Sequence, residues 1–229
     1  MVLVHGLVVS SRYMVPIAER LASHYRVYAP DLPGFGKSAK PPRALDMPEL
    51  ADSLDAWMQA TGLESAVLIG NSMGCQVIAH LAVRHPERVE RSVLQGPTMD
   101  PRGRTVLRQV GRFLTNSTRE PLSLAPTIML DYLAAGFGRA WRTFRYALQD
   151  RIEDNLPRVQ APTMVVRGSR DPIVPQRWAQ EATQLLPDGR LVVIPEVTHT
   201  ANFDAPSEFV RVIREFLNER QRWGNERGL

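Results

Sequence analysis

Short apolar runs alternate with longer amphipathic runs along most of this chain, and few architectures accommodate such an alternation. The apolar runs are rich in β-branched residues and have the length of strands, whereas the amphipathic runs have the length of helices. Strands that alternate with helices are joined by right-handed crossovers and form a parallel sheet buried on both faces. The sequence therefore predicts an α/β fold, in which a mostly parallel open sheet is flanked by helices.

The alternation predicts the positions of the strands and of the helices between them. Six strands are expected, at residues 2–4, 26–31, 65–70, 89–96, 163–168 and 190–195. Helices are expected at residues 11–23, 48–60, 72–84, 176–186 and 207–222. Asp46 and Glu49 supply an N-terminal capping signal for the second of these helices.

The alternation stops between residues 98 and 157, where no strand pattern occurs. Three helices are expected there, around residues 104–115, 124–134 and 139–152, between Gly96-Pro97 and Leu156-Pro157. We interpret residues 98–157 as a helical lid inserted into a core made of residues 1–97 and 158–229. The alternative is that these helices are ordinary packing helices.

Composition excludes several classes of protein. A chain of 229 residues fits one large α/β domain, and its one cysteine, Cys75, excludes an internal disulfide framework and a cysteine-based metal site. No apolar run reaches the ~18–20 residues of a membrane span, and the apolar opening lacks the basic residues of a signal peptide, so a cytoplasmic location is expected.

Charge patterning argues against nucleic acid as a partner. The net charge is +4, but basic residues are interleaved with acidic ones, as expected of solvated helix faces. We expect a small-molecule substrate, with no cofactor and no metal.

Gly70, Ser72 and Gly74 form a G-x-S-x-G motif where a predicted strand runs directly into a predicted helix. A sharp strand-to-helix turn exposes the serine hydroxyl, and its flanking positions must be small for the turn to pack. The N–H of Met73 then lies at a helix N-terminus, where it can stabilise an oxyanion. The alternative is a glycine-rich turn with a capping serine.

A serine nucleophile needs a base, and the base needs an orienting acid. His199 follows the last predicted strand, and Asp171 follows the strand before it, so both lie at the sheet edge where sites of open α/β sheets collect. Asp100, which follows another strand, is the competing acid. Ser72, Asp171 and His199 thus form a candidate catalytic triad.

Together these residues make the chain resemble the α/β-hydrolase superfamily from Met1 to about Leu217. The resemblance implies that the Leu7 N–H is the second oxyanion donor beside that of Met73, and that His5 is structural. Members of the superfamily usually begin with a β-hairpin, which is missing here. Residues 26–31 are therefore expected at an unpaired sheet edge, through which a homodimer could form. A misassigned start, a fragment and a natural short form all remain open.

The expected substrates pass through a tetrahedral oxyanion, and a carboxylic ester with a small or medium acyl group is the first expectation. The residues around Ser72 also resemble those of meta-cleavage-product hydrolases, which split carbon–carbon bonds and in which Asn71 would help to hold the substrate. Cys75 and Thr200 depart from that pattern. A non-catalytic binding protein of the same fold, or an inactive fragment, is the alternative from a different class.

Selectivity is expected to come from residues 98–157. Large apolar residues there, including Phe113, Met129 and Trp141, are candidates to line an acyl pocket, although such residues more often bury a helix against its core. The arginines of this segment could meet a carboxylate on the substrate, or could simply be solvated.

Overall fold

The computed structural model describes the backbone of residues 1–226 and the side chains of residues 1–218. Its centre is a parallel sheet whose strands lie side by side in chain order. These strands are β1 (Val2–Val4), β2 (Ala66–Asn71), β3 (Val89–Gln95), β4 (Thr163–Gly168) and β5 (Gly189–Ile194). The predicted α/β class with a parallel sheet is confirmed, and the bounds of these strands differ from the expected ones by no more than a residue.

The sixth expected strand, residues 26–31, is reduced to one parallel bridge between Val2 and Tyr28. The Tyr28 N–H donates to the Met1 carbonyl (2.9 Å), and its carbonyl accepts from the Leu3 N–H (2.8 Å). The segment lies at the sheet edge, as expected. Because its neighbour β1 has only three residues, the ladder cannot extend further along it.

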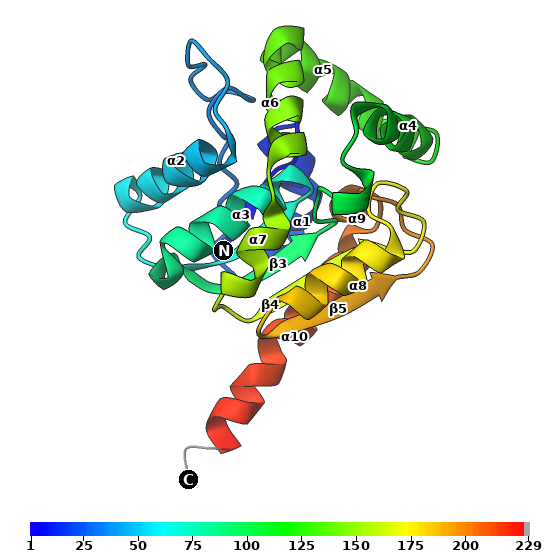
Figure 1. Ribbon diagram of the computed structural model, residues 1–229. Coiled ribbons are helices and arrows are strands. Elements are labelled where there is room, and N and C mark those ends of the chain that lie inside the picture. The colour runs from blue at the N-terminus through cyan, green and yellow to red at the C-terminus, as the bar shows by residue number, and fades with distance from the viewer. Residues whose placement is uncertain (227–229) are drawn as a thin grey trace.

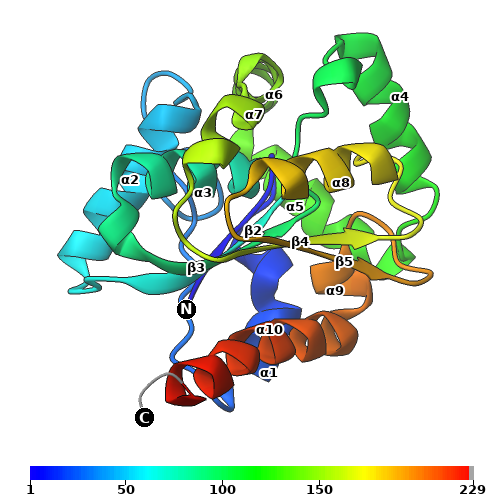
Figure 2. The same ribbon diagram turned by 60° about the horizontal axis from the view of Figure 1, so that its bottom comes forward.

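Helices cover both faces of the sheet (Figure 2). One face carries α2 (Met47–Ala60), α3 (Met73–Arg84) and α8 (Gln176–Leu185), and the other carries α1 (Val15–Ala22) and α10 (Pro206–Glu226). Each interface has its own apolar core, one containing Trp178 and the other Phe209. Burying such a side chain contributes about 1.5–3 kcal/mol.

Residues 98–157 contain helices and no strand. They form α4 (Val106–Ser117), α5 (Ala125–Ala135), α6 (Phe137–Gln149) and the short α7 (Ile152–Asn155). Figure 1 shows α4, α5 and α6 standing above the carboxyl end of the sheet, and the short α9 (Ala201–Asp204) follows β5. Single 3₁₀ turns occupy Ser11–Met14, Pro86–Arg88, Pro101–Gly103, Leu122–Leu124 and Leu156–Arg158. Within the described residues, no helix has both the length and the apolar character that crossing a bilayer requires.

Candidate active site

Ser72 occupies a strained turn between β2 and α3. Its φ of 55° and ψ of −117° are unusual for a residue with a side chain, and its N–H donates to the Gln95 carbonyl (2.9 Å). A Cβ on Gly70 would lie 2.8 Å from the Gly74 backbone, and a Cβ on Gly74 would collide with the Val4 carbonyl of β1. The two glycines of the motif are therefore required by close backbone contacts, which hold Ser72 at the carboxyl edge of the sheet.

Asp171 and His199 are brought together from the loops after β4 and β5. His199 Nδ1 lies 2.7 Å from Asp171 Oδ2, and both side chains are buried. The other carboxylate oxygen, Oδ1, accepts from the N–H groups of Ile173 (2.7 Å) and Val174 (2.9 Å). Because Asp171 only accepts, Nδ1 carries the proton and Nε2 is left with a lone pair.

Ser72 and His199 line one cavity of about 140 Å³. His199 Nε2 is buried and has no hydrogen-bond partner among the described residues, so it is not bonded to the Ser72 hydroxyl in this structure. An unpaired buried ring nitrogen is costly unless a ligand or a nearby hydroxyl satisfies it. The cavity therefore combines a hydroxyl on a strained turn with a free basic nitrogen.

The charge around His199 adjusts its basicity. Burial lowers the pKa of His199, but the charge and hydrogen bond of Asp171, with the charges of Glu120 and Asp204, offset this. The net pKa lies above the ordinary value near 6.5. His199 is thus a stronger base than a free imidazole.

Three amide side chains fix the backbone of His199. Gln95 Nε2 donates to its carbonyl (2.9 Å), as does Asn71 Nδ2 (3.5 Å), and Asn116 Oδ1 accepts from its N–H (3.4 Å). Asn71 also lines the cavity, where the sequence predicted a substrate contact. Nothing in the sequence pattern singled out Gln95 or Asn116.

Two backbone N–H groups are candidates to bind an oxyanion. Met73 is the first residue of α3, and Leu7 lies in the turn after β1; neither N–H has a hydrogen-bond acceptor among the described residues. The buried His5 ring bonds to the Gly6 carbonyl (2.9 Å) and accepts from the Leu32 N–H (2.9 Å). This pairing ties the turn that contains Leu7 to the loop after residue 31.

Gly96 lies directly beneath the histidine–aspartate pair. Its φ is +58°, and a Cβ there would lie 2.6 Å from His199 Cε1 and 2.8 Å from Nδ1. The sequence marked Gly96 only as a boundary before Pro97, because its role depends on a ring more than a hundred residues away in the chain. Only a residue without a side chain fits at this position.

Cys75, the other reactive group near the nucleophile, is buried. Its thiol donates to the carbonyls of Gly70 (3.3 Å) and Gln95 (3.4 Å). Burial raises the pKa of Cys75 well above its usual value, so the thiol stays protonated.

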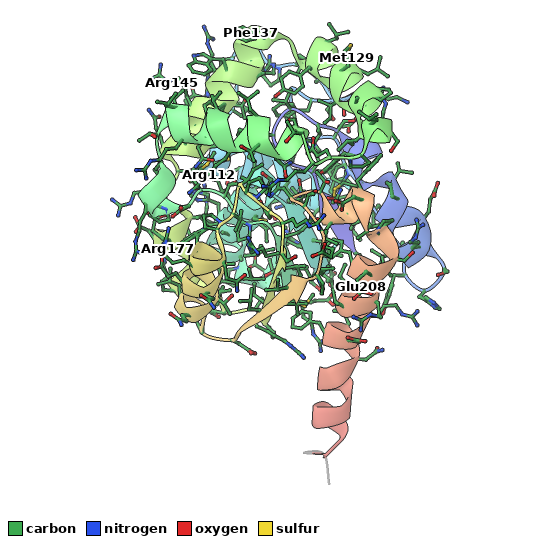
Figure 3. All side chains as sticks on the ribbon, turned by 90° about the vertical axis from the view of Figure 1, so that its right-hand side faces the viewer. Arg112, Met129, Phe137, Arg145, Arg177 and Glu208 are labelled. Carbon is green, nitrogen blue, oxygen red and sulfur yellow. The ribbon has the colours of Figure 1, made fainter. Side chains whose placement is uncertain are left out.

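Of the three residues that were expected to line an acyl pocket, two line a cavity and one lies on the outer surface. Phe113 lines the cavity beside Ser72, and with Trp141 it lines an adjoining apolar compartment of about 330 Å³ between α4 and α6. Met129 lines neither space: it is 65% exposed on α5, and Figure 3 shows it at the outer surface of the helical segment.

The competing acid, Asp100, lies elsewhere. It is buried and forms ion pairs with Arg112 (2.9 Å) and Arg177 (2.7 Å), two residues labelled in Figure 3. Within the described part of the chain, no arginine or lysine lines the cavity that contains Ser72 or the apolar compartment beside it. Among the described residues, no three histidine, cysteine or acidic side chains are placed to hold a metal ion.

The chain is similar in sequence and in structure to known hydrolases. Residues 1–212 match the alpha/beta hydrolase family. The pimeloyl-(acyl-carrier protein) methyl ester esterase of Aeromonas hydrophila is 26% identical, over 95% of this chain and 94% of that protein. The 2-hydroxymuconate semialdehyde hydrolase of Pseudomonas sp. strain CF600 is also 26% identical, over 89% of this chain and 80% of its own length. The structure of CarC, a serine hydrolase involved in carbazole degradation, superimposes with a TM-score of 0.75 at 27% identity, covering 95% of this chain and 90% of that one.

Proposed function

Because the chain belongs to the alpha/beta hydrolase family, we propose that it is a serine hydrolase that cleaves carboxylic esters or related acyl substrates. One observation carries this proposal: Ser72 and His199 line the same cavity, and His199 is bonded at 2.7 Å to a buried Asp171. A binding protein of this fold needs no nucleophile, base and orienting acid together.

In the first half of the reaction, His199 Nε2 removes the Ser72 proton as the hydroxyl oxygen attacks the ester carbonyl. The carbonyl oxygen becomes an oxyanion, which accepts from the N–H groups of Leu7 and Met73. Asp171 stabilises the imidazolium that forms. Collapse of the intermediate returns the carbonyl, breaks the bond to the alcohol oxygen and passes the His199 proton to the departing alcohol.

In the second half, water repeats these steps on the acyl-enzyme. His199 takes a proton from the water as its oxygen attacks the acyl carbon, and the proton then returns to Ser72 as the acid leaves. The apolar compartment lined by Phe113 and Trp141 supports an acyl group of small or medium size. In this proposal residues 98–157 act as a lid that selects the acyl chain.

The second candidate is hydrolysis of a carbon–carbon bond, the reaction that the resemblance to meta-cleavage-product hydrolases implies. Asn71 lines the cavity beside Ser72, as this alternative requires of a substrate-holding residue. Against it, the described residues that line the cavity include no lysine or arginine to bind a carboxylate on such a substrate. Ester hydrolysis is therefore the function we favour.

Intact-mass analysis after treatment with a fluorophosphonate tests the mechanism. We expect one adduct on the native protein and none on Ser72→Ala or on heat-denatured protein, because only an activated serine reacts. Ser72→Ala should also lose ester turnover while keeping its melting temperature within a few degrees. An adduct on Ser72→Ala, or a tenth of the activity remaining in that variant, would refute the assignment of Ser72 as nucleophile.

A further inference from the structure

A second acidic side chain, Glu120, lines the cavity that contains Ser72 and His199. It follows α4, and its Oε1 accepts from Asn116 Nδ2 at 2.6 Å. Its Oε2 has no hydrogen-bond partner in the described part of the chain, and no described lysine or arginine forms an ion pair with it. Asn116 also binds the His199 N–H, so Glu120 is held at a fixed place relative to the base.

Apart from Glu120 and the titratable His199, the described residues that line the cavity carry no formal charge. Among the described residues that line it, Glu120 is the only acidic one, and none is a lysine or arginine. The neighbouring Arg119 guanidinium donates instead to the Arg170 carbonyl (2.9 Å). Glu120 therefore places a negative charge in the same cavity as the unpartnered His199 Nε2.

Glu120 is only partly accessible to solvent, and burial raises its pKa, although the charge of His199 opposes the rise. A carboxylate that is partly removed from water without a lysine or arginine partner is unfavourable, and a ligand cation would offset that cost. Two aromatic side chains, Tyr13 and Tyr132, also line the cavity, and aromatic faces attract ammonium groups.

We propose that Glu120 is a specificity-determining residue, which binds a cationic group, such as an ammonium, on the substrate and disfavours substrates that carry a carboxylate. This inference deepens the proposed function, because the cation is placed beside the nucleophile that performs the hydrolysis. It also separates this chain from enzymes whose pockets use arginine to bind anionic substrates.

Three nitrophenyl esters of equal chain length test the proposal. Their acyl chains end in trimethylammonium, in the uncharged and isosteric tert-butyl group, or in a carboxylate. We expect kcat/KM to be about tenfold higher for the cationic ester than for the tert-butyl ester, and lower still for the anionic ester. In Glu120→Gln the ratio of cationic to tert-butyl ester should fall to about one. Glu208→Gln, the same change on α10 at a residue that does not line the cavity, should keep the ratio.

Because the readout is a ratio within each variant, a general loss of activity in Glu120→Gln does not affect it. A role for Glu120 only in the basicity of His199 would change all three esters equally and would overturn the proposal. So would a cation preference that survives Glu120→Gln.

Calorimetric titration with pentyltrimethylammonium separates this proposal from the proposed function. Binding that weakens about tenfold in Glu120→Gln supports the cation site even if no ester is hydrolysed, which would refute only the hydrolase proposal. Hydrolysis of the tert-butyl ester without charge preference, and without Glu120-dependent binding, would refute the cation site and leave the hydrolase proposal standing.

Discussion

Replacing Gly96 by alanine should disable the site while leaving the fold in place. The new Cβ would lie 2.6 Å from His199 Cε1 and 3.4 Å from Asp171 Oδ2. A carbon–carbon contact normally lies at about 3.5–4.0 Å, so the His199 ring must move by roughly 1 Å. The ring cannot move that far and keep its 2.7 Å hydrogen bond to Asp171 in place.

The expected loss follows from that displacement. A 1 Å error in the position of a catalytic group costs about 100-fold in rate, so kcat/KM should fall by at least that factor. The stability cost is smaller, because the positive φ of Gly96 costs alanine about 1–2 kcal/mol. In a chain of this size that corresponds to a fall in melting temperature of about 2–8 °C.

Gly62→Ala provides the matched control. Gly62 has a φ of +69°, and a Cβ there would meet nothing within 4 Å. It should lose a similar amount of stability and no esterase activity, measured as kcat/KM on nitrophenyl butyrate beside the melting temperature. If Gly96→Ala kept activity within threefold of the unmodified protein, or if Gly62→Ala lost as much, the placement of Gly96 against the base would be refuted.

Three further predictions concern the base, the ion pairs and the acyl compartment. Burial lowers the pKa of His199, but Asp171 raises it by more, so kcat/KM should rise with pH through an apparent pKa above 6.5. Asp171→Asn should shift the midpoint of this rise to lower pH. A kcat/KM that stays constant from roughly pH 5 to 8 would contradict the role of His199 as the base. The same shift makes His199 contribute stability at low pH that is lost as pH rises through its folded pKa, which denaturation at several pH values can check. Asp100→Ala removes the ion pairs of Asp100 with Arg112 and Arg177, although Arg177 keeps its pair with Glu181 (2.6 Å), and should lower the free energy of unfolding by about 2 kcal/mol. An unchanged denaturation midpoint would show that the pairs with Asp100 do not contribute to stability. Trp141→Ala should reduce kcat/KM for octanoyl relative to acetyl esters by about threefold to tenfold, and Met129→Ala, outside both spaces, should not; equal effects would refute the assigned compartment.

Local signals were sufficient to predict the framework of the fold. The β-branched runs predicted β4 at its observed bounds, and the glycines around Ser72 predicted the turn into α3. Both depend on residues adjacent in sequence, where periodicity and steric restriction act directly. Residues 26–31 have the composition of a strand, but their pairing also depends on the neighbouring β1, which offers only three residues as a partner.

Long-range packing explains what the sequence did not reveal. Gly96 looks like a turn glycine until His199 is placed against it, and Glu120 looks like a surface residue beside Arg119. For Met129 the sequence was misleading in another way: its apolar side chain favoured a place in the pocket, but α5 exposes it to solvent. None of these outcomes follows from neighbouring residues alone.

The Asn116 contact has a consequence for the exchange of segments between related enzymes. Asn116 belongs to α4, yet it binds the backbone of the loop that follows β5. A helical segment transplanted from a homologue to change substrate preference would remove this tether unless it supplied an equivalent amide. Chimeras recombined at residues 98 and 157 would then change in turnover as well as in selectivity, because the backbone of His199 would lose this contact. A transplanted segment should therefore keep an asparagine at the position of Asn116.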